Sequence, residues 1–111
     1  MKAIIDDQSE TFTLINTFEV ATGQGAAVVN SLSLFTDETA KHLEGFVGAS
    51  VHVSLDGSRV VNYVQWRTAQ HLAAMLALPA SKAHMDEVRS LSLSVNPVPY
   101  AVKFVRAAAV D

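Results

Sequence analysis

Two hydrogen-bonding side chains stand four positions apart in the segment SRVVNYVQW, namely Asn62 and Trp66. The β-branched and aromatic composition of this segment predicts a strand, so both side chains should point to the same face. Asparagine is uncommon inside strands, and a buried amide is either bonded to the protein or kept for a ligand. The indole N–H also needs a partner when the ring is buried. The pair indicates two polar points on an apolar wall that are kept for a ligand, with a purely structural role as the alternative for each.

Other polar side chains could complete such a site. His52 lies in the preceding segment FVGASVHVSL, and an imidazole is the natural proton acceptor near neutral pH. Asn16 is the one polar residue on an otherwise apolar face of TFTLINTFEV, where it could line the same pocket. His71 and His84 belong to helical segments and are either exposed or part of the site. We expect His42 to cap the first helix, because a cation is favoured at a helix C-terminus.

Composition excludes several other kinds of chemistry. The 111 residues include no cysteine, which excludes disulfides, thiolate zinc sites and iron–sulfur clusters. The histidines show no metal-binding spacing, and no phosphate loop or G-x-S-x-G elbow is present, so we expect no metal, no cofactor and no hydrolase triad. A net charge of -3 argues against nucleic acid as a partner. Without an apolar run near ~20 residues or a signal-peptide core, we expect a cytoplasmic protein with no membrane span.

The hydrophobic pattern predicts one domain at residues 11–111, after a loose segment at residues 1–10. Glycine, proline and capping residues set the expected boundaries between its elements. The first half should contain a strand at 11–20, a helix at 25–44 ended by Gly45, and hairpin strands at 46–55 and 58–66 around Asp56-Gly57. The second half should contain a helix capped by Thr68 and stopped by Pro79, a helix capped by Ser81, and a last strand from Pro97 to Val105. The order β-α-β-β-α-α-β is a ferredoxin-like α+β fold.

The register of the hairpin decides which residues share a face with Asn62. A three-residue loop ending in a left-handed Gly57 would pair Ser50 with Asn62 and His52 with Val60, which groups the polar residues. A two-residue turn would instead pair Val51 with Asn62 and place His52 on the opposite face. We favour the three-residue loop, because it makes one face a ligand wall that includes His52.

The other face of the favoured hairpin is nearly continuous apolar surface. It would carry the side chains Val47, Ala49, Val51, Val53, Val61 and Tyr63. Half of the chain is hydrophobic and only 17% is charged, which is little charge to cover a small monomer. We therefore expect a homodimer that buries this face.

The hairpin and the helix after it, GFVGASVHVSLDGSRVVNYVQWRTAQHLAAML, resemble the antibiotic biosynthesis monooxygenase family. The resemblance extends over about residues 12–106 and implies a dimeric α+β barrel. Relatives that oxidise anthrones to quinones without a cofactor imply that Asn62 and Trp66 hold substrate oxygens and that His52 belongs to the site. The implied activity is a monooxygenase acting with O2 on an aromatic small molecule.

The same resemblance marks departures from those enzymes. Leu72 stands where they have a tyrosine, and their helix arginine falls near Met85 and Asp86 here. His71, His84 or Arg89 could supply the missing proton handling. The expected pocket comprises the side chains Asn16, Phe46, Leu72, Met75 and His84, beside Asn62 and Trp66.

Haem-degrading relatives offer an alternative comparison. Asn16 matches their first-strand asparagine and His84 lies within one residue of their iron-ligating histidine. Met75 stands where they carry a tryptophan that presses on the porphyrin, which argues against haem degradation and leaves haem binding open. A non-catalytic or stress-related binding dimer of the same fold is the other alternative.

Overall fold

The computed structural model describes residues 11–109, so the loose segment expected at residues 1–10 lies outside the described residues. Its elements follow the predicted order β-α-β-β-α-α-β, with a short 3₁₀ helix added after the first helix. In chain order they are β1 (Phe12–Glu19), α1 (Gly25–Glu38), the 3₁₀ helix (Ala40–His42), β2 (Phe46–Val53), β3 (Arg59–Trp66), α2 (Ala69–Leu76), α3 (Pro79–Leu91) and β4 (Ser94–Tyr100).

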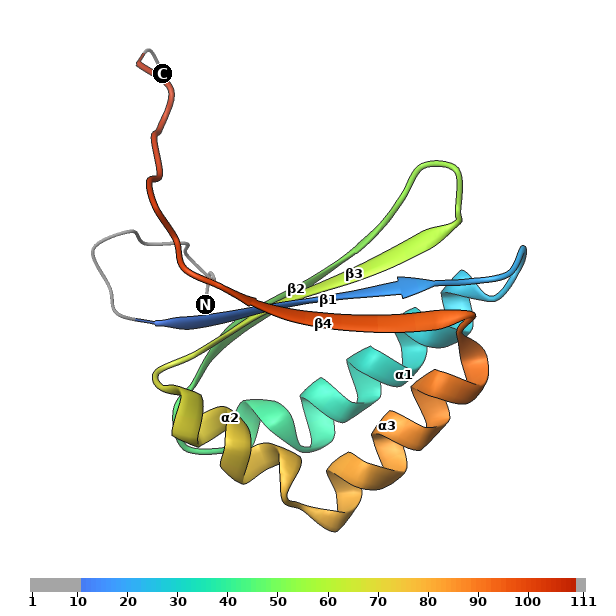
Figure 1. Cartoon of the computed structure of the whole chain (residues 1–111), viewed down its shortest axis with the longest axis horizontal. Helices are drawn as coiled ribbons and strands as arrows, with labels where there is room; N and C mark the ends of the chain where they lie inside the picture. Colours follow the sequence, from blue (N-terminus) through green and yellow to red (C-terminus); the bar gives the residue numbers. More distant parts are fainter. Residues whose placement is uncertain (1–10, 110–111) are drawn as a thin grey trace.

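The four strands form one antiparallel sheet in the order β2-β3-β1-β4. All three α-helices cover one face of this sheet and leave the other face without a helix, as Figure 1 shows. This arrangement confirms the predicted ferredoxin-like α+β class. None of the helices in the described part of the chain is long and apolar enough to cross a membrane.

The core between the sheet and the helices has two parts. Phe18, Val60, Val28 and Val88 pack together with almost no exposure, between the middle of α1 and the later turns of α3. Val64, Trp66 and Leu72 form the second buried cluster, near α2. Burial of such side chains contributes about 1.5–3 kcal/mol each, so both ends of the sheet are held rigidly against the helices.

Several helix boundaries differ from the prediction. The first helix ends at Glu38 rather than residue 44, and His42 in the 3₁₀ helix reaches back so that its Nε2 lies 2.9 Å from the Asp37 carbonyl oxygen. Thr68 caps α2 as predicted, accepting from the His71 backbone N–H. Ser81 was expected to cap the next helix, but that helix begins earlier, with Pro79 in its first turn, where a missing N–H costs nothing.

The last strand is shorter than predicted. β4 ends at Tyr100, which pairs with Thr13, and β1 begins only one residue earlier at Phe12. Residues 101–105 alternate like a strand, but no pairing joins them to the described residues of β1. They form an extended arm that rises from the sheet on the side away from the helices (Figure 1).

The predicted register of the hairpin is wrong. Val51 pairs with Asn62 and His52 with Val61, which is the register of the alternative turn. The connection is a wider loop, in which the Gly57 N–H bonds the Ser54 carbonyl oxygen at 2.9 Å. The Asp56 carboxylate closes the loop by accepting from the Ser58 backbone and from the hydroxyls of Ser54 and Ser58. These bonds lower the pKa of Asp56 to about 2, so the carboxylate keeps its charge and the loop its shape.

The corrected register reverses the predicted faces of the β2 residues from Gly48 onward. His52 is exposed on the face without helices, where its Nε2 lies 3.0 Å from the Ser50 hydroxyl. Val51 and Ala49, which were expected at a dimer interface, pack against the core instead. A bulge between Phe46 and Gly48 returns Phe46 to the helix side, opposite Trp66.

Candidate active site

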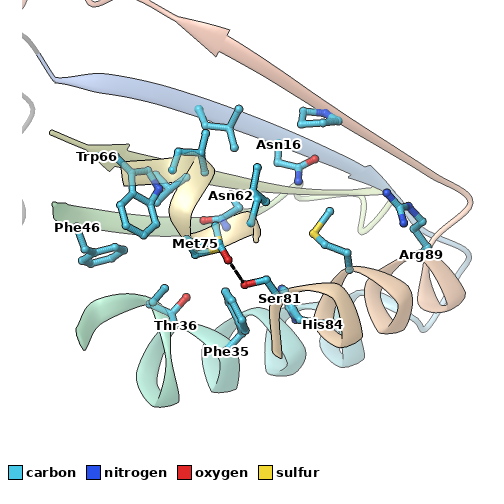
Figure 2. A pocket seen from close by; sticks show the side chains of 17 residues that line it. Asn16, Phe35, Thr36, Phe46, Asn62, Trp66, Met75, Ser81, His84 and Arg89 are labelled. Atoms are coloured by element: carbon cyan, nitrogen blue, oxygen red, sulfur yellow. Dashed lines mark hydrogen bonds between the residues drawn. The ribbon is translucent and has the colours of Figure 1, made fainter. Parts of the chain in front are cut away.

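A cavity of about 340 Å³ lies between the sheet and the three helices. Its size falls within the range of small-molecule sites, about 300–1,000 Å³. Figure 2 shows Asn16 and Asn62 on the sheet side, and Phe35, Ser81 and His84 on the helix side. The lining residues are Leu14, Asn16, Phe35, Thr36, Ala40, Phe46, Asn62, Val64, Trp66, Leu72, Met75, Leu76, Ser81, His84, Met85, Arg89 and Pro97.

The two asparagines are direct partners on neighbouring strands. Asn16 of β1 stands opposite Asn62 of β3, so both amides leave the sheet at the same level. The Oδ1 atom of each is buried and has no hydrogen-bond partner within the described structure. Leaving a buried polar group unsatisfied costs about 1–3 kcal/mol, so this pair is poorly explained as structure alone and well suited to a ligand.

Trp66 contributes a third unpartnered polar atom. Its side chain is fully buried and meets Phe46 edge to face, with ring centroids 5.4 Å apart and planes at 87°. The indole Nε1 has no partner among the described residues. Packing against Phe46 therefore fixes the indole ring of Trp66, and the indole N–H stays available to a ligand in the cavity.

The helix side is built on a stack of two rings. The Phe35 and His84 rings lie 4.3 Å apart and within 4° of parallel. Nδ1 of His84 lies 3.4 Å from the Ser31 hydroxyl. Burial lowers the pKa of His84, and the nearby Glu87 carboxylate opposes this shift to a smaller extent. The imidazole is therefore neutral at neutral pH and able to accept a proton.

The rest of the wall is mainly apolar. Leu72 and Met75 of α2 flank the tryptophan, and Met75 is held by the Ser81 hydroxyl, which donates to its carbonyl oxygen and lies 3.2 Å from its sulfur. Arg89 is the one cationic side chain on the described wall, and it pairs loosely with Asp86 at 3.7 Å. Within residues 11–109 no group of three potential metal ligands converges.

Most of the residues that the sequence singled out meet in this cavity. They are Asn16, Phe46, Asn62, Trp66, Leu72, Met75 and His84. His52 does not reach it, because the hairpin register turns it to the other face, and the expectation of a base at that point on the wall is wrong. His71 also lies outside, packed beside Gly45 and bonded to Thr68.

The sequence did not single out several residues of the wall as site candidates, among them Phe35. Ser81 was taken as a helix cap, although its hydroxyl holds Met75. Pro97 lies opposite Asn16 on β4, a contact that depends on strand pairing across the sheet. Thr36 and Met85 each lie one position after a ring of the Phe35–His84 stack. Residues one position apart do not share a helix face, so helical spacing gave no signal for them.

Comparisons with known proteins agree with this geometry. The family model for antibiotic biosynthesis monooxygenases matches residues 11–87. Tetracenomycin-F1 monooxygenase of Streptomyces glaucescens is 40% identical over 90 residues, covering 81% of this chain and 80% of that protein.

Two solved structures share the fold. A monooxygenase from the gene ActVA-Orf6 of Streptomyces coelicolor, in complex with nanaomycin D, superposes with a TM-score of 0.77 at 23% identity, covering 88% of this chain and 92% of that one. SnoaB, a cofactor-independent oxygenase from Streptomyces nogalater, superposes with a TM-score of 0.74 at 19% identity, covering 93% and 100%. From the family model and the tetracenomycin-F1 relative together, the chain belongs to the antibiotic biosynthesis monooxygenase family.

Proposed function

We propose that this protein is a cofactor-independent monooxygenase that oxidises an aromatic, anthrone- or quinol-like polyketide with O2 to a quinone. The observation that carries the proposal is the set of three unpartnered polar atoms, from Asn16, Asn62 and Trp66, on the wall of a mainly apolar cavity. The tetracenomycin-F1 monooxygenase relative, at 40% identity, supports the same reaction class.

The cavity suits a flat polycycle that carries oxygen atoms on its edge. Apolar side chains such as Leu72 and Met75 would contact the rings, while the amides of Asn16 and Asn62 would meet phenolic hydroxyls or carbonyl oxygens. An amide offers an acceptor at one end and donors at the other, so each asparagine can serve either group. The indole N–H of Trp66 would donate to a carbonyl oxygen at the end of the cavity near Phe46.

The reaction needs no external electron donor, because the substrate itself supplies the electrons. Loss of one proton from the anthrone methylene leaves an electron-rich anion, which passes one electron to O2. The two radicals join through a new C–O bond, the peroxide takes up a proton, and cleavage of O–O with loss of the second C–H proton releases water and the quinone. Anthrone and O2 thus give quinone and water. Asn62 would contribute by hydrogen bonding to the oxyanion formed in the first step.

Oxygen uptake tests this proposal. Protein freed of metal and flavin is given 1,8-dihydroxyanthrone, and O2 consumption and quinone absorbance are followed together. We expect both to exceed the buffer rate in equal amounts, and Asn62→Ala to lower kcat by about 10²-fold, as removal of one oxyanion donor does. Asn30→Ala, at an exposed position on α1, is the matched control. No uptake by the wild-type protein across a panel of anthrones and quinols would overturn the proposal.

The haem-binding alternative is tested on the same samples. It rests on Asn16 and His84, which match residues of haem-degrading relatives and both line the cavity. Titration with haem, followed at the Soret band with and without His84→Ala, measures it directly. A saturable Soret shift that the variant loses, together with no anthrone oxidation, would favour the haem-binding alternative over the oxygenase.

We also propose that two copies associate through the sheet face that the helices leave uncovered. This face carries the half-buried side chains of Ile15, Val61, Tyr63 and Val98. Across the four described strands, its charged side chains are confined to Glu19 and Arg59, which pair at one end. Tyr100 and Phe104 continue the apolar surface onto the arm, with 51% and 68% of their areas exposed. A sheet face with charged side chains at one end only favours association with a second copy of the chain.

A further inference from the structure

We propose that His84 is the catalytic base, and that it passes the substrate proton to solvent through a groove between α1 and α3. The inference rests on the proposed function, because it names the proton acceptor that the first step of that reaction requires. It replaces the role that the sequence had suggested for His52.

The position of the His84 ring carries this inference. The ring lines the cavity between the sheet and the helices, and it also lines a separate groove of about 340 Å³ on the outer side of α1 and α3. Phe35, stacked against it, lines both spaces as well. The two stacked residues therefore border both the candidate substrate site and the outer groove.

Ser31 orients this imidazole. Its hydroxyl lies 3.4 Å from Nδ1 of His84, and Ser31 lines the outer groove but not the cavity. A hydrogen bond at one ring nitrogen determines which nitrogen carries the proton. With Nδ1–H donated to Ser31, Nε2 keeps the lone pair that accepts from the substrate.

The charges around His84 suit both of its protonation states. Burial lowers its pKa, so the neutral acceptor predominates at neutral pH. Glu87 of α3 and Glu38 of α1 both line the outer groove, where they would stabilise the imidazolium formed by proton transfer. Arg89 lies on the cavity wall and is partly offset by Asp86. The carboxylates thus lie on the side by which the proton would leave.

The other histidines of the described chain are placed elsewhere. His42 is bonded to the Asp37 carbonyl oxygen, His52 lies on the uncovered sheet face, and His71 packs beside Gly45. In the proposed step, the substrate C–H bond breaks and an N–H bond forms at Nε2. The electron pair stays on the substrate as the anion that O2 oxidises, and the proton passes from the imidazolium to water in the groove.

The pH dependence of oxygen uptake tests the base. With 1,8-dihydroxyanthrone, wild-type kcat/KM should fall at low pH with an apparent pKa below 6.5, the ordinary value for histidine. His84→Gln should lower kcat by about 10²- to 10⁴-fold with little change in KM, and should remove this acid limb. Imidazole added to His84→Ala should restore part of the rate. His52→Gln and His71→Gln are matched controls, which should keep both the wild-type kcat and the fall of kcat/KM at low pH.

A second variant keeps the test decisive if His84→Gln does not fold. Glu87→Gln, at an exposed position, removes the carboxylate that raises the pKa of His84, so the acid limb should move to lower pH. Two results would overturn the role of His84 and leave the oxygenase proposal standing. One is a Glu87→Gln variant whose kcat/KM falls at the same low pH as in the wild-type protein. The other is a folded His84→Gln variant that keeps both the wild-type rate and the wild-type fall of kcat/KM at low pH. A wild-type protein with no uptake would overturn the oxygenase proposal itself.

Discussion

The buried Oδ1 atoms of Asn16 and Asn62 have no hydrogen-bond partner among residues 11–109, although each lies in the middle of a paired strand. Each unsatisfied atom is a cost to the free protein that a ligand can remove. Such a cost is common where a surface is built for binding rather than for stability. At the scale of single residues, the protein should therefore gain stability when this polarity is removed and lose activity at the same time.

Asn62→Leu tests this exchange of stability for activity directly, because leucine has the same branched shape as asparagine, with two methyl groups in place of the amide, and no polar atom. We expect the free energy of unfolding, measured by urea denaturation, to rise by about 1 kcal/mol. Oxygen uptake should fall at least as far as in Asn62→Ala. Asn30→Leu, on the exposed side of α1, should change neither quantity by a comparable amount. A clear loss of stability in Asn62→Leu would mean that the amide holds the sheet together.

At the scale of elements, the entry into β2 positions the aromatic end of the cavity. Gly45 has a φ of +86°, and its carbonyl oxygen accepts from the Arg67 N–H at 2.7 Å, which ties the start of β2 to the end of β3. The next residue is Phe46, whose ring holds Trp66. A Cβ at Gly45 would overlap the His71 imidazole, so only glycine fits between β2 and α2.

Gly45→Ala should therefore destabilise the protein by at least about 2 kcal/mol, from the left-handed backbone and the overlap with His71 together. Gly23→Ala is the control, since Gly23 has the same φ of +86° but open space around its Cβ position. It should cost about 1 kcal/mol, the backbone contribution alone. Equal melting temperatures for the two variants would show that the His71 side chain moves aside freely.

At the scale of the whole molecule, the helices cover one face of the sheet and leave the other open (Figure 1). A sheet with few charged side chains on its open face is stable in water when another surface covers it. The side chains on that face include Ile15, Val61, Tyr63 and Val98. Val61 and Tyr63 were predicted there, whereas the corrected register of β2 removes Val51 and Ala49 from it.

Tyr63→Glu should convert the proposed dimer into a monomer, because the carboxylate would be buried without a partner in the interface. Sedimentation equilibrium at micromolar concentration measures the change. Ala73→Glu, at an exposed position on α2, adds the same charge on the opposite side of the sheet and should leave the dimer intact. A wild-type protein that sediments as a monomer would contradict the proposed association.

The sequence by itself determined the order of the elements. It also determined which side chains of the two central strands, β1 and β3, point toward the helices. Alternation placed Leu14, Asn16 and Phe18 on one face of β1, and Asn62 with Trp66 on one face of β3. These are local properties, because side chains two residues apart share a face whatever surrounds the strand. The predicted order of elements and the places of Asn16, Asn62 and Trp66 on the cavity wall follow from such local rules. Leu72, Met75 and His84 were predicted from the family resemblance, and Phe46 reaches the cavity through the bulge in β2.

Only the tertiary structure decided how these elements meet. The Asp56 loop selected the register that removes His52 from the site, through hydrogen bonds that involve residues on both sides of the turn. β4 stops beside the start of β1, and the packing of α1 on α3 brought Phe35 onto His84 across 49 positions of chain. Contacts between distant residues depend on how whole elements pack, and no local pattern in the chain encodes them.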